Sequence, residues 1–367
     1  MRLIALSRAA EGVEIARDVR TGNPGEVPLL RAGARLSGSY RTRLLEMGLR
    51  AIWIEDHLSE GIEPLPPLEE EVRQDAERRV GSVIVDATAA LKEGRPMRGA
   101  ALEQLHQVAH LIAAQVSSLP EAAYALSDLA SADAYTHRHS VQVAVLGLML
   151  ADRHWRRVGW TDWQGHSRFD RLEERLSRLG LGLLVHDIGK LAVPAGILEK
   201  PGRLDAAEWD VMRAHPEAGV EMLKATGISP LSLDIVRSHH ERIDGSGYPR
   251  GIGGRQLHEF ARIGGIVDTY DAIVSERVYQ PGRPSHVALN ILTADSPGKF
   301  DTDLVHTFER VAVPFPAGAT VPLPDGRAGV VADADVHDPW QPVVRTPDGD
   351  ELRLDLTALD QRRAIAI

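Results

Sequence analysis

Cysteine is absent from the 367 residues of this chain. Disulfide bonds and thiolate ligands are therefore excluded, and any metal ion must be held by nitrogen and oxygen atoms. A long apolar run is also lacking, because the strongest one, residues 141–150, has about half of the ~20 residues that a membrane span needs. The N-terminal segment meets acidic residues too early for a secretory signal, so we expect a cytoplasmic protein without a membrane partner.

Basic residues are in the minority. The 42 Lys and Arg residues against 52 Asp and Glu residues give a formal net charge of −10. This balance argues against a nucleic-acid polymer as partner, since such binding needs an extended basic surface. It leaves room for a small anionic substrate, because bound metal ions and arginines can reverse the field within one cleft.

The overall composition is that of a globular protein, with 43% apolar and 26% charged residues. Prolines 64, 66 and 67 mark a linker, and Pro-Asp-Gly turns at 324 and 347 separate short apolar runs near the end. We therefore expect a mainly α protein in four parts. These are a small N-terminal α+β module (1–62), a helical lead-in (63–130), an all-helical central domain (131–312) and a small C-terminal β module (313–367).

The spacing of apolar residues predicts the helices of the central domain. Asp205 followed by Glu208 has the pattern of a capping box, which marks the start of one of them. In the N-terminal module one helix is expected at 40–47. The helices expected in the central domain are 134–154, 168–187, 205–214, 217–225, 231–240, 259–277, 285–292 and 301–311.

Histidine and carboxylate residues gather at the breaks between these helices. The run HHERIDGSGYP (239–249) follows the run HDIGK (186–190) and an isolated His-Pro at His215. Side chains of these types are the ligands of borderline transition metals. A lone His-Asp pair would more often be a core histidine beside a capping aspartate. However, a buried charged aspartate is costly unless it is paired or bound to a metal.

The number of such residues favours a metal centre. Asp268 falls within the apolar face of the helix expected at 259–277. His139 lies one turn and two turns before apolar positions of its own helix, so it too can point inward. Each residue alone is more often structural, but their shared position at the inner ends or faces of successive helices predicts one common centre.

The motifs, taken in order, resemble one known family, the HD-GYP proteins. This family is a branch of the HD-domain metal-dependent phosphohydrolases, and the resemblance covers roughly residues 130–312. The segments that carry it are YTHRHS (135–140), LLVHDIGKLAVPAGILEKPGRL (183–204), MRAHPEAG (212–219), HHERIDGSGYPRGIGG (239–254) and ARIGGIVDTYDAI (261–273).

The resemblance implies an all-helical HD-type domain around a metal cluster, in which Asp187 bridges two ions. Family members with a third metal carry a Glu at the position of Tyr135, so two divalent metal ions are expected here. Iron or manganese is the family's usual choice, in keeping with nitrogen and oxygen ligands. The implied metal ligands are His139, His186, Asp187, His215, His239, His240 and Asp268.

The resemblance also implies phosphodiesterase action on cyclic di-GMP. A water bridging two cations is deprotonated in such a site and attacks phosphorus, giving linear pGpG, with further hydrolysis to GMP left open. Asp187 and Lys190 would be catalytic, Asp187 as the bridge and Lys190 as a fixed cation. Lys190 and Arg277, which matches an arginine of the family's D-R-P-Y segment, would bind the substrate. Gln280 departs from the family by lacking a cation.

The loop that carries Gly247, Tyr248 and Pro249, here called the GYP loop, has two interpretations. Its residues are candidates for substrate binding, because the tyrosine offers an aromatic face to a guanine or to a partner such as a diguanylate cyclase. In the other interpretation the loop is a rigid support for His239 and His240.

Two other functions stay open. One is hydrolysis of another cyclic dinucleotide or nucleotide, since spacing does not reveal the residues that read the base. The other is a weakly active module that responds to cyclic di-GMP and binds a partner, which the complete ligand set disfavours. The flanking modules are candidate surfaces for regulation or for a homodimer.

Overall fold

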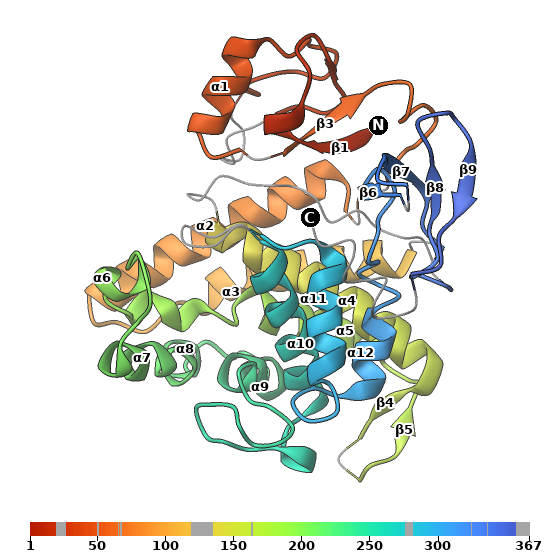
Figure 1. The fold of residues 1–367 in the computed structure, drawn as a ribbon. Helices are drawn as coiled ribbons and strands as arrows, with labels where there is room; N and C mark the ends of the chain where they lie inside the picture. The colour runs from red at the N-terminus through yellow and green to blue at the C-terminus, as the bar shows by residue number, and fades with distance from the viewer. Residues whose placement is uncertain are drawn as a thin grey trace.

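The computed structural model describes residues 1–19, 27–49, 51–64, 66, 68–118, 135–162, 164–275, 282–323, 325–335 and 337–356. Helices dominate this part of the chain, and small antiparallel sheets flank them at both ends (Figure 1). The expected mainly α fold with small strand modules is thereby confirmed. Within the described residues, no helix is both long and apolar enough to cross a lipid bilayer.

The N-terminal module combines a small sheet with one helix. Strands β1 (Arg2–Ala5) and β2 (Glu14–Ile15) both pair antiparallel with β3 (Ala51–Glu55). Helix α1 (Gly38–Glu46) begins two residues before the expected start, because the Ser37 side chain caps it by accepting the Tyr40 N–H. The apolar side chains of this module form a hydrophobic cluster of their own.

A layer of long helices forms the body of the molecule. Helices α2 (Glu70–Lys92) and α3 (Gly99–Ser118) pack on α4 (Tyr135–Val158) and α5 (Leu172–Leu184). A hairpin of β4 (Trp160–Thr161) and β5 (Ser167–Arg168) lies between α4 and α5 in the chain. The elements after α5 are, in order, η3 (Ile188–Ala192), α6 (Ala195–Leu198), α7 (Ala206–Arg213), α8 (His215–Leu223), α9 (Pro230–Ser238), η4 (Gly254–Gln256), α10 (Glu259–Val274), α11 (Ser285–Asp295) and α12 (Thr302–Phe308).

The structure shortens one expected helix at both ends. Residues 168–187 were expected to be helical, but Arg168 pairs with Trp160 in the β4–β5 hairpin. Helix α5 begins only after Arg171, whose φ of 54° lies outside the helical region. It stops at Leu184, because Val185 leaves the helical conformation and the chain turns into η3. His186 and Asp187 therefore lie in the turn after the helix.

The C-terminal sheet is an antiparallel meander in the order β6-β7-β8-β9. Its strands are β6 (Thr320–Pro322), β7 (Ala328–Asp333), β8 (Val343–Arg345) and β9 (Glu351–Arg353). Its buried Val321, Val331 and Val344 belong to the same hydrophobic cluster as the long helices. The expected division of the chain at residues 62, 130 and 312 stays a prediction.

Candidate metal centre

The seven predicted ligands come from five places in the helical body. His139 lies on α4, His186 and Asp187 in the turn after α5, His215 at the start of α8, His239 and His240 just after α9, and Asp268 on α10. Six of these side chains are buried and that of His240 is largely so. They form two groups, each with its ligand atoms within 4.8 Å of one another: Asp187, His215, His239 and His240 in one, and His139, His186 and Asp268 in the other.

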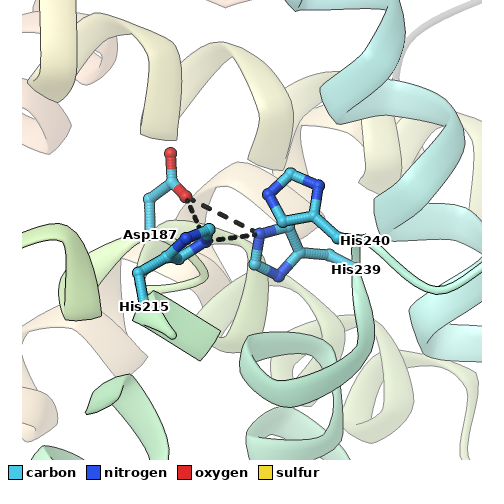
Figure 2. Close-up of side chains that lie close together, drawn as sticks. All are labelled: Asp187, His215, His239 and His240. Carbon is cyan, nitrogen blue, oxygen red and sulfur yellow. Dashed lines mark hydrogen bonds and ion pairs between the residues drawn. The ribbon is translucent and has the colours of Figure 1, made fainter. Parts of the chain in front are cut away.

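Asp187 belongs to the first group and also lies close to the second. Its Oδ1 atom lies 3.4 Å from Nε2 of His215 and 3.6 Å from Nε2 of His239 (Figure 2). Its Oδ2 atom lies 3.5 Å from Nε2 of His139 and 3.5 Å from Nε2 of His186. One carboxylate thus faces each group with a different oxygen, which is the arrangement a bridging ligand needs.

Three of the histidines are oriented by main-chain carbonyls. A carbonyl oxygen can only accept a hydrogen bond, so the Nδ1 atom that contacts it carries the proton and the Nε2 lone pair faces the centre. These carbonyls belong to the last turns of α5, α7 and α9, and that of Ile235 also accepts the main-chain N–H of His239. The Nδ1···O distances are 2.8 Å for His186 to Leu183, 2.8 Å for His215 to Met212 and 3.0 Å for His239 to Ile235.

A carboxylate that the sequence analysis did not single out orients the fourth. Oδ2 of Asp271 lies 2.6 Å from Nδ1 of His139 and also accepts from Ser275 Oγ at 3.1 Å. Asp271 is completely buried on α10. It follows Asp268 by three residues, so one turn of helix places both carboxylates on the same face. The three-residue spacing after Asp268 was the feature of the sequence that could have pointed to Asp271.

Two glycines let the main chain of η3 press against α8. A Cβ atom on Gly189 would lie 1.9 Å from the carbonyl oxygen of His215 and 2.5 Å from the nitrogen of Gly219. No side chain fits at such a distance. The glycine of the HDIGK motif is therefore what brings His215 to within reach of Asp187.

The GYP loop folds back onto the end of α9. The Glu241 carboxylate is 2% exposed and accepts the N–H groups of Arg250 at 2.8 Å and Ile252 at 3.2 Å. A Cβ atom on Gly247 would lie 2.4 Å from Cα of Glu241, so this glycine permits the close approach. The ring of Tyr248 stacks on His240, with centroids 4.6 Å apart. The loop thus makes the contacts of a support for His240.

Burial and pairing set the charges of the centre. Burial lowers the pKa of His239 to about 4 and also holds the pKa of His240 well below its usual value. Burial disfavours the charged form of Asp187, but the charge of Lys190 and hydrogen bonds to His139 and His215 outweigh this and hold its pKa well below the usual value. The ionised Asp187 carboxylate beside the neutral imidazoles of His239 and His240 has the protonation states that bind a cation.

His139 and Asp268 titrate in opposite directions. Burial opposes the charge of His139, but hydrogen bonds to Asp187, Asp268 and Asp271 prevail and raise the pKa of this imidazole well above its usual value. Asp268 is equally buried, yet its hydrogen bonds with His139 and His186 hold its pKa well below the usual value. A proton on His139 therefore occupies the place of a cation between these carboxylates.

Lys190 lies at the edge of the centre on η3. Its Nζ atom is 2.5 Å from Oδ2 of Asp187, and its side chain is 31% exposed. Lys190 thus contacts the carboxylate that faces both groups, and its catalytic and substrate-binding roles stay predictions. Arg277 and Gln280 lie outside the described residues.

The donor atoms fit divalent metal ions. Oδ1 of Asp187 is buried and has no hydrogen-bond partner among the described residues. Nε2 of His215 faces Nε2 of His239 at 3.4 Å, and Nε2 of His139 faces Nε2 of His186 at 3.2 Å. Imidazole nitrogens and a carboxylate oxygen that converge in this way are the donor set that a divalent transition metal ion takes. Histidine and aspartate clusters that can bind metal ions are therefore present.

Comparison with protein families matches residues 169–304 to the HD domain. The matched range includes six of the seven residues of the centre, and His139 precedes it. The match thus covers the turn with His186 and Asp187, the start of α8, the GYP loop and α10.

Curated relatives carry names of one enzyme class. The cyclic di-GMP phosphodiesterase PA4108 of Pseudomonas aeruginosa is 38% identical over 223 residues, which are 60% of this chain and 50% of the relative. A cyclic di-GMP phosphodiesterase of Thermotoga maritima is 33% identical over 162 residues, 44% of each chain. The 3'3'-cGAMP-specific phosphodiesterase 3 of Vibrio cholerae is 36% identical over 158 residues, 43% of this chain and 31% of the relative.

The chain spans half or less of the length of these relatives. The matched domain and these relatives confirm the resemblance that the motifs indicated. Residues 169–304 of this chain match the HD domain, and the chain is similar to these cyclic-dinucleotide phosphodiesterases over 43–60% of its length.

Proposed function

We propose that this chain is a metal-dependent phosphodiesterase that opens cyclic di-GMP to linear pGpG. The observation that carries the proposal is the pair of His/Asp groups joined by the two oxygens of Asp187. The relatives named as cyclic di-GMP phosphodiesterases support the choice of substrate. Whether the enzyme continues to GMP depends on release of the linear product.

Two divalent ions, iron or manganese, would be held by the two groups of the centre. When bound, such ions supply Lewis acidity and make water a nucleophile at neutral pH. The chain contributes preorganisation: carbonyl-bonded Nδ1 atoms keep the Nε2 lone pairs of His186, His215 and His239 in place, and Asp271 orients His139.

Lys190 and the GYP loop form the rim that the substrate meets. The ammonium group of Lys190 is a fixed positive charge where negative charge grows on the phosphoryl oxygens. Tyr248, between Gly247 and Pro249, supports His240 and turns the rest of its surface to the substrate. Arg277 completes the substrate-binding set in this proposal, on the basis of its sequence position alone.

A second candidate substrate is 3'3'-cGAMP. It is favoured by relatives in Vibrio cholerae that are named as specific for this dinucleotide, one of them 43% identical over 98 residues. Both substrates share the phosphodiester that the centre would cleave and differ in one base. The centre can therefore cleave either dinucleotide, and the residues that contact the base decide which substrate is preferred.

The test is turnover by the full chain after anaerobic loading with Fe(II) or Mn(II). Wild-type protein is incubated with cyclic di-GMP and, separately, with 3'3'-cGAMP, and the products are identified by chromatography. We expect pGpG, and we expect the variant Asp187→Asn to lose bound metal and turnover together. Asp152→Asn, which changes a buried aspartate of α4 that bonds to Ser117, is the matched control.

Survival of hydrolysis in Asp187→Asn would refute the centre. Wild-type protein that stays free of metal after loading, yet binds cyclic di-GMP or a diguanylate cyclase, would instead identify a binding module without turnover.

A further inference from the structure

Four planar side chains lie in a row that leads from the metal centre to the surface. This row, here called the file, consists of His240, Tyr248, Arg213 and Trp209. Tyr248 stacks on His240, the guanidinium carbon of Arg213 lies 5.6 Å from the centroid of the Tyr248 ring, and it lies 5.7 Å from that of Trp209. Arg213 and Trp209 are four residues apart on α7, so they lie on one face of this helix. The file begins at a residue of the centre and ends on α7, at the edge of the helical body (Figure 1).

The outer two members of the file are open to a ligand. Trp209 is 45% exposed, a large fraction for the largest apolar side chain. Arg213 is exposed as well, and among the described residues no carboxylate forms an ion pair with it. By contrast, Lys190 and Arg250 near the centre each contact a carboxylate. Arg213 is thus an exposed positive charge without an ion-pair partner among the described residues, two residues before His215 and in contact with Tyr248 of the GYP loop.

We propose that Arg213 and Trp209 form an outer subsite, in which the Arg213 guanidinium binds the phosphate that is not cleaved and the Trp209 ring stacks on the base beside it. The inference rests on the proposed phosphodiesterase function. A cyclic dinucleotide has two phosphates and two bases, so when one phosphate lies at the centre the other nucleotide extends over the adjacent surface. A planar cation and an exposed indole ring are the groups that such a nucleotide requires.

Contacts with two aromatic rings restrict the position of the Arg213 guanidinium. Its guanidinium lies between the rings of Tyr248 and Trp209, so its position is set before the ligand arrives. Preorganisation of this kind lowers the entropic cost of binding. The GYP loop would then act on the substrate through Arg213 as well as through Tyr248.

The test compares Arg213→Met and Trp209→Ala with wild-type protein in the metal-loaded full chain. We expect KM for cyclic di-GMP to rise about tenfold in each variant, the size of effect that one base stack or one charge-assisted hydrogen bond has, with kcat within about twofold. The dissociation constant of cyclic di-GMP from metal-free protein, measured by calorimetry, should rise by a similar factor. Trp209→Phe should restore most of the affinity, because it keeps an aromatic face.

Matched controls change the same residue types elsewhere. Phe169→Ala removes a 64% exposed aromatic ring beside the β4–β5 hairpin, and Arg43→Met removes an exposed arginine of α1. Both positions lie far from α7 (Figure 1), and we expect neither KM nor the dissociation constant to change.

A structural role would give a different result. If Arg213 only fastens α7 to the GYP loop, its loss should reduce activity on cyclic di-GMP and on bis(4-nitrophenyl) phosphate equally. The proposed subsite instead predicts that the ratio of kcat/KM for these two substrates falls about tenfold, since the small diester cannot reach α7.

The outcomes separate the two proposals. Equal losses on both substrates, or an unchanged KM and dissociation constant in both variants, would overturn the subsite while leaving the phosphodiesterase function intact. Wild-type protein that neither binds nor hydrolyses a cyclic dinucleotide would overturn both.

Discussion

Hydrogen bonds at Nδ1 decide which ring nitrogen of His139, His186, His215 and His239 faces the metal centre. For His186, His215 and His239 a neutral carbonyl oxygen holds the Nδ1 proton. For His139 the buried carboxylate of Asp271 takes this role at 2.6 Å. A charged acceptor raises the basicity of the ring more than a carbonyl does, so Asp271 should contribute to metal affinity although it is not itself a predicted ligand.

Asp271→Asn should therefore weaken metal binding. The amide keeps the shape but removes the charge that polarises His139, and we expect a loss of metal affinity of about 10–100-fold. Competition with a chelator during metal titration measures it. Asp152→Asn is the control, because this aspartate is also buried but bonds to Ser117 and Arg156, away from the centre. Equal affinities in both variants would contradict the role of Asp271.

His286 gives the protein a separate sensitivity to acid. Its side chain is 4% exposed and stacks on Phe315, and burial lowers its pKa to about 4. Below the unfolded value near 6.5 the unfolded chain binds a proton that the folded chain does not, so stability falls as the pH drops toward 4. Between pH 7 and pH 5 the loss from this residue should reach up to about 2 kcal/mol.

His286→Phe should remove this part of the pH dependence. The variant keeps an aromatic ring against Phe315 but cannot be protonated. Urea unfolding of metal-free protein at pH 7 and pH 5 measures the free energy of unfolding, and the decrease should be smaller in the variant than in the wild type. The idea fails if both proteins lose the same amount.

At the scale of elements, the centre depends on how closely η3 approaches α8. Both elements are short, and neither can bury much surface alone. The contact is made by main-chain atoms around Gly189 and Gly219, where side chains are excluded. Capping fixes the neighbouring element, since Asp205 and Glu208 form the capping box at the start of α7 that the sequence predicted.

Gly189→Ala should separate the two elements. The new methyl group would lie 1.9 Å from the His215 carbonyl oxygen, so the chain must shift, at a cost of about 1–3 kcal/mol. The shift moves His215 away from Asp187, so bound metal per chain should fall together with the melting temperature. Gly196→Ala on α6 meets no atom within 4 Å and should be neutral or slightly stabilising. Thermal unfolding with metal analysis compares the two.

At the scale of the whole molecule, the two β modules contact each other. The Leu3 N–H donates to the Gly318 carbonyl at 2.9 Å, and Arg345 of β8 donates to the Glu60 carbonyl at 2.6 Å. The N-terminal module has its own hydrophobic cluster, whereas the C-terminal sheet shares that of the helices. The N-terminal module is therefore held to the rest partly by polar contacts with the C-terminal sheet.

Arg345→Met should loosen this attachment without unfolding the helical body. Amide exchange in residues 56–62 should accelerate roughly tenfold, the effect of losing about 1.4 kcal/mol of local stability, whereas exchange in α4, α5 and α10 should not change. Arg327→Met in the same sheet removes an arginine that pairs with Asp325 and Asp348 and serves as the control. Exchange that accelerates throughout the chain would speak against a separate module.

The sequence by itself determined the HD domain, the mainly α fold and the identity of the seven candidate ligands that gather at the centre. These could be predicted because HDIGK and HHE…GYP are contiguous motifs, and because helix periodicity is a local property. Helix ends were less predictable, as α5 shows, because a short hairpin and the Gly189 contact decide them.

Tertiary structure alone decided how the residues are grouped. His139 and Asp271 are 132 residues apart in the chain, and only the packing of α4 against α10 allows Asp271 to orient the His139 ring. The two-sided position of Asp187 and the file from His240 to Trp209 arise in the same way. Spacing along a chain fixes which residues share a face of one element, but contacts between elements follow from the burial of whole faces, which no single motif contains.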